Sequence, residues 1–183
     1  MRIVAGELGG RKLRVPKGEA VRPTTDRVRE ALFSILGDVG GLDVLDLYCG
    51  TGALGLEALS RGAAAVTFVD TDIRPARTNA KELGVIDRVD LIRADTSAFL
   101  RRDRRSHDLV LLDPPYRLAR SVAPDLSELL APRLHAGARV VVESAAGEPL
   151  ELDGSAYTLS DERSYGTTAI RIYEIGRSAG VSR

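Results

Sequence analysis

From residue 43 onward, short apolar runs rich in Val, Ile and Leu alternate with segments whose apolar residues recur at helical spacing. The short runs predict strands and the helically spaced segments predict helices. The predicted strands are Asp43 to Tyr48, Ala65 to Asp70, Val89 to Arg93, Leu109 to Asp113, Arg139 to Glu143, Ala156 to Leu159 and Ala169 to Ile175. The predicted helices lie near Ala53 to Arg61, Arg74 to Leu83, Thr96 to Arg101 and Ala123 to Leu134.

The alternation of strands with helices predicts right-handed crossovers and a mostly parallel, doubly wound α/β sheet of seven strands. Gly62 and Gly84 follow two of the predicted helices directly, as helix stop signals do. Only the polar stretch "SDERSYGT" joins the last two strands, which predicts an antiparallel hairpin that closes the sheet edge, with the last strand antiparallel. That ending is more typical of Rossmann-like methyltransferases than of dehydrogenases.

Two further elements precede the sheet. The stretch "RPTTDRVREALFSIL" predicts a helix capped by Thr25, with Val28, Leu32 and Leu36 on one face. The stretch "RIVAGELGGRKLRVP" predicts a small hairpin that turns at Gly9 and Gly10.

The net charge is zero, but the charged residues are distributed unevenly along the chain. Residues 1–29 contain eight Lys and Arg against three Asp and Glu, so this segment is +5 and the remainder of the chain is −5. A basic segment gains free energy by neutralising phosphates and releasing counterions, so it favours a polyanionic partner, although a solvated charged arm has the same composition.

Composition also bounds the class of protein. No apolar run is long enough for a membrane span or the core of a signal peptide, so we expect a cytoplasmic protein. The only cysteine is Cys49, which we interpret as a small buried turn residue, and the only histidines are His107 and His135, which we place on the surface. No zinc-ligand spacing can be assembled from these residues, so we expect no metal.

A glycine pattern follows the first predicted strand in "VLDLYCGTGALG", with Gly50, Gly52 and Gly55 spaced as G-x-G-x-x-G. This spacing fits the pyrophosphate turn of a dinucleotide site, with Asp70 as the acid that binds ribose. Asp46, near the end of the strand, would instead repel pyrophosphate and attract the ammonium and sulfonium of S-adenosylmethionine. The turn alone leaves both ligands open.

A second motif, Asp113-Pro114-Pro115-Tyr116, ends the fourth predicted strand. Proline donates no ladder hydrogen bond, so a Pro-Pro pair by itself only ends a strand. A carboxylate and a rigid carbonyl, however, can accept both N–H hydrogens of an exocyclic base amine and align its nitrogen with a methyl donor. The ring of Tyr116 can stack on an extruded base.

Taken in order, these motifs and the two N-terminal stretches give residues 2 to 175 a resemblance to the bacterial 16S ribosomal RNA guanine-N2 methyltransferases, the RsmD-type class I enzymes. The resemblance implies transfer of one methyl group from S-adenosylmethionine to the N2 of a loop guanine in the small ribosomal subunit. It implies three regions: a basic RNA-binding hairpin over residues 1–22, a class I methyltransferase domain over 23–176 and a disordered tail over 177–183.

The resemblance also assigns residues. Asp113, Pro114, Pro115 and Tyr116 match the catalytic motif, and Asp95 matches the acid that meets the adenine amine. The expected cofactor-binding residues are Asp46, Tyr48, Gly50, Thr51, Gly52, Asp70, Thr71, Asp95 and Thr96. The expected RNA-binding residues are Arg2, Arg11, Lys12, Arg14, Arg22 and Thr24. For the region around Thr24, Thr25, Arg27 and Arg29, helix capping and surface charge remain the alternative.

Other functions stay open on the sequence alone. A DNA adenine-N6 methyltransferase shares the acid-Pro-Pro-aromatic logic but normally carries a separate target-recognition region, for which 183 residues leave little room. An NAD-dependent oxidoreductase gives Asp46 and Asp113 no role, and a non-catalytic ribosome-assembly factor leaves both carboxylates unexplained. We expect the small subunit's 16S ribosomal RNA as partner, no membrane contact and a monomer.

Overall fold

The computed structural model describes residues 1–16, 25–148 and 150–176, with the side chains of 116–122 left aside. Two compact units divide the chain, Met1–Thr96 and Ser97–Arg183. The predicted boundary at residue 22 stays a prediction. Arg22, Thr24 and the expected disordered tail, 177–183, lie outside the described residues.

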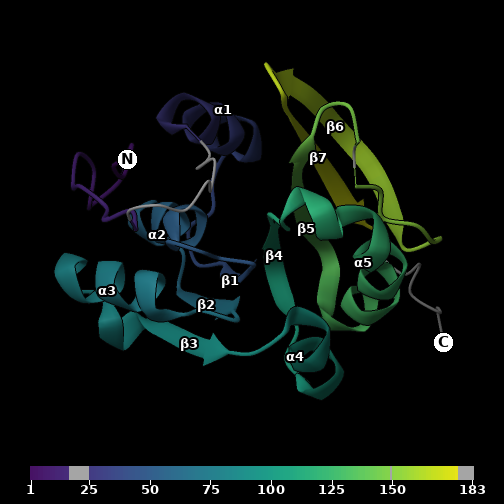
Figure 1. Cartoon of the computed structure of the whole chain (residues 1–183), viewed down its shortest axis with the longest axis horizontal. Helices are drawn as coiled ribbons and strands as arrows, with labels where there is room; N and C mark the ends of the chain where they lie inside the picture. Colours follow the sequence, from purple (N-terminus) through teal and green to yellow (C-terminus); the bar gives the residue numbers. More distant parts are fainter. Residues whose placement is uncertain (17–24, 149, 177–183) are drawn as a thin grey trace, which may run out of the picture. The chain divides into compact units, whose positions relative to one another are not determined.

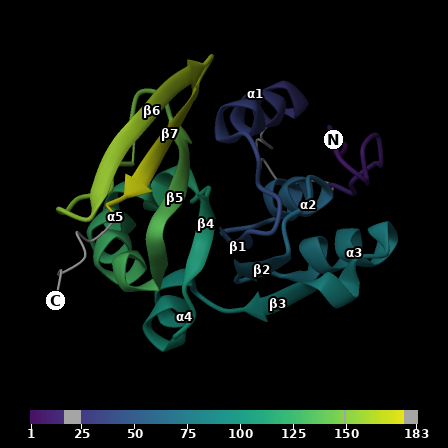
Figure 2. The same ribbon diagram turned by 180° about the vertical axis from the view of Figure 1, so that it is seen from behind.

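The first unit contains a three-stranded parallel sheet in the order β3-β2-β1, flanked by helices (Figure 1). Its elements are α1 (Asp26–Leu36), β1 (Asp43–Leu47), α2 (Ala53–Ser60), β2 (Ala65–Asp70), α3 (Arg74–Leu83), a 3-10 turn (Ile86–Arg88), β3 (Val89–Arg93) and the start of α4 (Thr96–Arg102). All eight residues of α2 are buried. In both views the N-terminal hairpin lies beside α2 (Figures 1 and 2).

The N-terminal segment forms the predicted hairpin, held by an antiparallel bridge between Arg2 and Lys12. The Ile3 amide donates to the Arg11 carbonyl at 2.9 Å, and the Gly10 amide donates to the Ile3 carbonyl at 2.9 Å. The predicted cap of α1 is also confirmed, because the Thr25 hydroxyl accepts the Val28 N–H at 3.3 Å.

The second unit contains four described strands in the order β4-β5-β7-β6. Its elements are β4 (His107–Leu112), α5 (Tyr116–Leu130), a 3-10 turn (Ala131–Arg133), β5 (Leu134–Ala145), β6 (Tyr157–Tyr165) and β7 (Thr168–Ile175). β5 is parallel to β4, whereas β7 lies between β5 and β6 and runs antiparallel to both. The prediction of an antiparallel last strand is therefore confirmed.

Several predicted boundaries were wrong in this unit. β6 continues to Tyr165, so only Gly166 and Thr167 join it to β7 instead of the whole "SDERSYGT" stretch. All nine residues of β6 are half-buried or exposed, so the strand has no apolar alternation and exists because it pairs with β7. α5 begins at Tyr116, seven residues earlier than predicted, directly after the Pro-Pro pair, and β5 is longer than predicted at both ends.

The surface placement of His107 was also wrong. Its side chain is completely buried at the start of β4, and its Nε2 lies 3.1 Å from Asp103 Oδ2. The Asp103 carboxylate also accepts the Arg105 Nε–H at 3.0 Å. Buried polar groups require such partners, so we interpret this cluster as structural.

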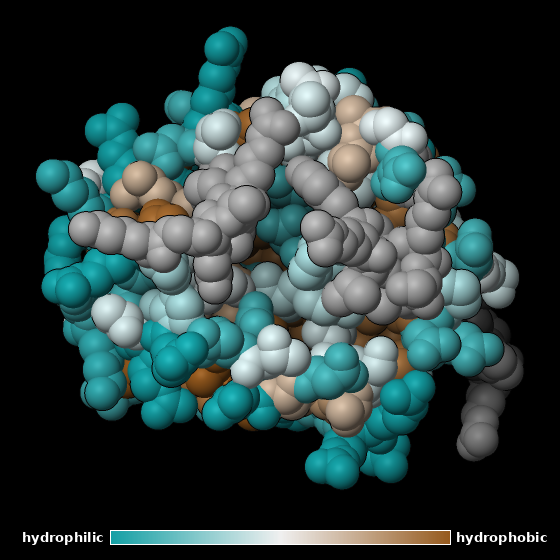
Figure 3. All heavy atoms as spheres, in the orientation of Figure 1, coloured by the Kyte–Doolittle hydropathy of each residue, from teal (hydrophilic) through white to brown (hydrophobic). Residues whose placement is uncertain are grey.

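Hydrophilic residues predominate on the described part of the face shown in Figure 3, and apolar residues are visible only in small areas between them. Among the described residues, no helix is both long and apolar enough to span a bilayer. The described part of this face therefore offers polar contacts rather than a broad apolar surface.

Candidate active site

The turn between β1 and α2 has an unusual backbone. Tyr48, Gly50 and Gly52 have positive φ angles of 57°, 51° and 76°, and Gly52 is the N-cap of α2. Glycine adopts such angles without the steric cost that a side chain imposes. A Cβ built on Gly50 meets no atom within 4 Å, so open space adjoins the turn there.

Gly55, by contrast, allows α2 to pack closely on the sheet. A Cβ at this position would lie 2.5 Å from Phe68 Cε1, 2.8 Å from Val66 Cγ1 and 2.9 Å from Asp46 Oδ2. The Gly55 amide donates to Asp46 Oδ2 at 2.9 Å. Asp46 is 2 % exposed, so its carboxyl group anchors the first turn of α2 to β1.

Burial raises the pKa of the Asp46 carboxyl group to about 7, while the Gly55 N–H lowers it and the charge of Asp70 raises it. The unfolded chain has an ordinary Asp pKa of about 4, so between about pH 4 and pH 7 the unfolded state loses a proton that the folded state keeps. This carboxyl group therefore stabilises the fold fully below that window, and its contribution is lost as the pH rises through it.

We expect Asp46→Asn to abolish that contribution. The quantity to compare is the difference in free energy of unfolding, unmodified protein minus variant. As the pH rises, this difference should fall by about 1 kcal/mol per pH unit between about pH 5 and pH 7 and then level off. Urea unfolding of both proteins at several pH values measures this difference. Parallel pH profiles for the two proteins would show that Asp46 does not titrate in this range.

Asp70, at the end of β2, ties the strand to the turn. Its Oδ2 accepts the Gly50 N–H at 2.9 Å, and its Oδ1 accepts the Asp72 N–H at 2.9 Å and the Thr71 hydroxyl at 3.4 Å. A carboxylate offers about four lone-pair sites, so Asp70 retains acceptor capacity beyond these three contacts. It can therefore hold the turn and also accept a hydroxyl group of a ligand.

Three more of the predicted cofactor-binding residues, Asp70, Asp95 and Thr96, lie around Tyr48. Its hydroxyl is hydrogen-bonded to the side chain of Thr96, which is 2 % exposed. Burial raises the pKa of Tyr48, and the charges of Asp95 and Asp70 raise it further. The structure thus brings Tyr48, Asp70, Asp95 and Thr96 together around an acidic region, which disfavours a pyrophosphate and favours cationic or hydrogen-donating ligands.

Cys49 is buried in the same turn, as predicted. Burial raises the pKa of its thiol well above the usual range, and the charges of Asp46 and Asp70 raise it further. The thiolate is the nucleophilic form of cysteine, so this residue is suited to packing rather than to covalent catalysis.

The second motif lies in the second unit, between β4 and α5. Asp113 follows the last residue of β4 and is half-buried, Pro114 is buried and Pro115 is exposed. Pro115 is the N-cap of α5 with φ −53° and ψ 132°, and Tyr116 is the first helical residue. The Pro-Pro pair thus fixes an extended backbone between a strand end and a helix start.

The basic arm is the N-terminal hairpin region, of which the structure describes residues 1–16. Its side chains contact the helices α1 and α3. Arg2 Nε lies 3.5 Å from Asp26 Oδ2 of α1. The Arg11 guanidinium donates to the Glu82 carbonyl of α3 at 2.8 Å, and Arg14 forms an ion pair with the Glu82 side chain. The side chains of Arg2 and Arg14 stay 66 % and 73 % exposed, and Lys12 is exposed as well, so this surface remains accessible to a ligand.

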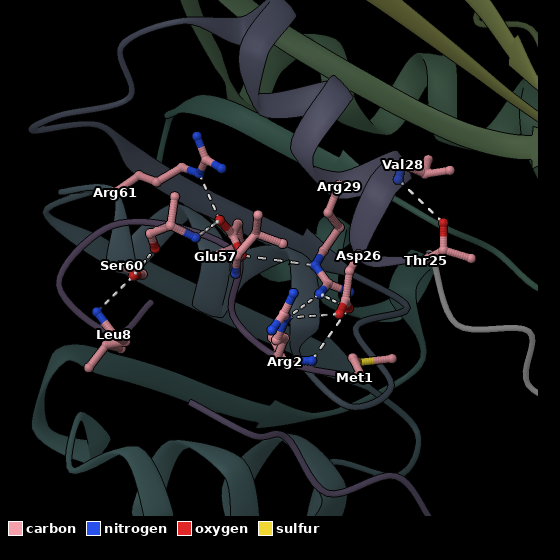
Figure 4. Close-up of polar contacts among 12 residues, drawn as sticks. Met1, Arg2, Leu8, Thr25, Asp26, Val28, Arg29, Glu57, Ser60 and Arg61 are labelled. Atoms are coloured by element: carbon pink, nitrogen blue, oxygen red, sulfur yellow. Dashed lines mark hydrogen bonds and ion pairs between the residues drawn. The ribbon is translucent and has the colours of Figure 1, made fainter. Parts of the chain in front are cut away.

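Two buried charges that hold the arm were not predicted as such (Figure 4). Arg29, for which surface charge and a ligand contact were both open, is completely buried and donates to the Arg2 carbonyl and to Asp26 Oδ1, the latter at 2.7 Å. Glu57 of α2 accepts the Val4 N–H at 2.7 Å and the Ala5 N–H at 3.0 Å. A lone Glu inside the apolar stretch "ALGLEALS" was the available signal in the sequence.

No cluster of three or more His, Cys, Asp or Glu that could hold a metal ion occurs among the described residues.

Comparison with known proteins identifies the chain's relatives. The sequence pattern of the family described as Conserved hypothetical protein 95 matches residues 1–174. The ribosomal RNA small subunit methyltransferase D of Escherichia coli K12 is 36 % identical over 179 residues, which cover 95 % of this chain and 89 % of that protein. The chain belongs to the ribosomal RNA small subunit methyltransferase D family. This membership confirms the resemblance seen in the sequence.

Solved structures support the same conclusion. The yhhF protein of Escherichia coli matches with a TM-score of 0.85 at 35 % identity, over 97 % of this chain and 98 % of that one. An RNA methyltransferase from Salinibacter ruber in complex with S-adenosyl-L-homocysteine shares the fold, with a TM-score of 0.63 at 22 % identity over 87 % of this chain and 97 % of that one. The family's fold is the Rossmann-like methyltransferase sheet that was predicted, and it favours the methyl-donor interpretation of the glycine turn over the dinucleotide one.

Proposed function

We propose that this protein transfers a methyl group from S-adenosylmethionine to the exocyclic N2 of one loop guanine in 16S ribosomal RNA. Family membership supports the reaction class, because the curated relative is a ribosomal RNA small subunit methyltransferase. One observation carries the finer assignment: Asp113-Pro114-Pro115-Tyr116 lies directly between β4 and α5. A DNA adenine would share this motif, so the preference for ribosomal RNA over DNA rests on family membership, and a dinucleotide gives Asp113 no role.

The first unit is proposed to hold the cofactor, and its described residues fit that ligand. Asp70 would accept ribose hydroxyls, Asp95 would accept the adenine amine, and the acidic surroundings of Tyr48 suit a ligand with an ammonium and a sulfonium. The open space beside Gly50 leaves the backbone of the turn accessible. When bound, the cofactor supplies an electrophilic methyl group on its sulfonium.

In the second unit, the Asp-Pro-Pro-Tyr motif is proposed to bind the target base. The lone pair of a guanine amine is delocalised into the ring, so the free amine is a poor nucleophile. Asp113 would accept one N–H and the Pro114 carbonyl would accept the other, which fixes the nitrogen's direction and favours its pyramidal form. Tyr116 would stack on the base and keep it out of the RNA helix.

The basic arm is proposed to contact the RNA backbone. Arg14 forms an ion pair with the Glu82 carboxylate, and Arg11 donates to the Glu82 backbone carbonyl. An exposed ion pair contributes at most about 1 kcal/mol, so a phosphate can replace Glu82 as the partner of Arg14. The proposed substrate places the reaction in the bacterial cytoplasm, and we propose that the protein acts as a monomer.

Replacing Arg11, Lys12 and Arg14 together with glutamine should weaken binding to the small subunit roughly tenfold at low salt. The slope of log K against log salt should become shallower by about 2, because each lost phosphate contact contributes about 0.7 to 0.9. Filter binding at several salt concentrations measures both quantities. The matched control neutralises Arg101, Arg102 and Arg104, which we expect to be solvated; an equal effect of both triple variants would remove the arm's special role.

The experiment that tests the proposed function uses labelled S-adenosylmethionine and three substrates: small subunits from an Escherichia coli strain without its ribosomal RNA small subunit methyltransferase D, naked 16S ribosomal RNA, and DNA. We expect label in the 16S RNA and none in DNA. Label in DNA alone, or in none of the three, would refute the proposal.

A further inference from the structure

Asn79 is the only carboxamide side chain in the sequence, which has no other asparagine and no glutamine. It lies on α3 and is 1 % exposed. Burying an amide costs free energy unless its donors and acceptor are satisfied, so the partners of Asn79 show what it is placed to hold.

Those partners belong to two different parts of the first unit. On the arm, Asn79 Oδ1 accepts the Arg14 N–H at 2.8 Å, and Asn79 Nδ2 donates to the Arg14 carbonyl at 3.1 Å. On the glycine turn, the same Nδ2 donates to the Thr51 carbonyl at 2.9 Å. One side chain therefore connects the arm's backbone with the backbone of the turn.

Thr51 is the point at which the turn needs such a contact. It lies between Gly50 and Gly52, which both have positive φ and no side chain to restrict them. Asp70 fixes the Gly50 amide from β2, and Asn79 fixes the Thr51 carbonyl from α3. A second contact, from the Thr51 hydroxyl to Met1 Sδ at 3.7 Å, also joins the turn to the arm.

We propose that Asn79 is a positioning residue that couples RNA binding on the arm to cofactor binding in the turn. The proposal rests on the proposed function, which puts the RNA on the arm and the methyl donor at the turn. Phosphate contacts at Arg11, Lys12 and Arg14 hold the arm, and the arm then holds Asn79 and the Thr51 carbonyl in the orientation that the cofactor requires. Coupling between two sites is reciprocal, so the cofactor strengthens RNA binding by the same factor.

The test measures the affinity of the full chain for S-adenosylhomocysteine with and without saturating small subunits. We expect small subunits to tighten this binding by about fivefold or more in the unmodified protein, the lower end of common coupling strengths. The measured ratio is the dissociation constant for S-adenosylhomocysteine without small subunits divided by the constant with them. In Asn79→Ala this ratio should fall to below about twofold, even if the variant binds S-adenosylhomocysteine more weakly overall. The control is Thr78→Ala, whose exposed hydroxyl bonds only to the Arg74 carbonyl of its own helix among the contacts described; its ratio should stay unchanged.

A purely structural asparagine would lower the melting temperature and weaken both ligands in Asn79→Ala without changing the ratio, and that result would overturn the inference. If small subunits do not change the affinity of the unmodified protein for S-adenosylhomocysteine, the inference is overturned too. In that case, methyl transfer to 16S RNA would still support the proposed function. Absence of transfer together with absence of both bindings would instead refute the proposed function.

A second measurement needs no variant. The Arg14 amide donates to Asn79, so its hydrogen exchange should slow when S-adenosylhomocysteine binds alone, although the ligand's proposed site is at the turn. Exchange mass spectrometry of peptides covering residues 10–16 measures this rate. Unchanged exchange at saturating ligand would contradict the coupling.

Discussion

Replacing Asp113 with asparagine should slow methyl transfer by about a thousandfold, in the middle of the range for a positioned group that acts on a reacting proton. The variant keeps the size of the side chain but replaces a charged acceptor by a neutral amide, half of which donates hydrogen bonds. The amide oxygen can still accept an N–H, but without the negative charge it stabilises the positive charge that develops on the guanine nitrogen less well, and the amide nitrogen cannot accept at all.

Binding of the cofactor should be almost unaffected, because the residues proposed to hold it belong to the first unit of the chain. We expect the dissociation constant for S-adenosylhomocysteine to stay within about threefold of its original value. Asp125→Asn, an exposed acid on α5, is the matched control and should keep full activity. Loss of both binding and transfer in Asp113→Asn would show that Asp113 supports the fold rather than the reaction.

Glu57→Gln should destabilise the fold strongly, by about 3 to 5 kcal/mol. The Glu57 carboxylate is completely buried and accepts two backbone amides of the arm and the Arg61 Nε–H at 2.8 Å. Its Oε2 also lies 4.0 Å from the Nε of the buried Arg29 (Figure 4). Glutamine removes the negative charge and turns one acceptor into a donor that faces other donors.

For a chain of this length, such a loss corresponds to a melting temperature lower by about 10 °C. Glu128→Gln is the control, because Glu128 is exposed on α5, and it should change stability by less than about 0.5 kcal/mol. Amide exchange at Val4 and Ala5 should also become faster in Glu57→Gln at temperatures where the protein stays folded. Equal melting curves for the two variants would mean that the buried charge does not hold the arm.

The parts of the fold that could be predicted are those whose signal is local. β2, β3 and α3 have the predicted boundaries because apolar runs, glycine stops and helical spacing coincide there. β6 was largely missed, because a strand with polar residues throughout is defined by its pairing with β7 rather than by its own pattern. The start of α5 was missed because the apolar pattern begins later than the helix does.

The site shows the same division. The glycine turn and the Asp-Pro-Pro-Tyr motif are contiguous in sequence, so their spacing was sufficient to find them. Arg29, Glu57 and Asn79 act through partners 27 to 65 residues away along the chain, and no spacing rule connects such positions. For Asp46, the sequence predicted a cofactor-binding residue but not its hydrogen-bond partner. Only the structure shows that its carboxyl group accepts the Gly55 amide.

The central claim is that the chain methylates the N2 of a single guanine in 16S ribosomal RNA. The most direct test incubates undermethylated small subunits with the protein and S-adenosylmethionine, digests the 16S RNA and identifies the new nucleoside and its position by mass spectrometry. We predict N2-methylguanosine at one loop position, formed about a thousandfold more slowly with Asp113→Asn. A methyl group on another atom of guanine, on another base or at many positions would contradict the account.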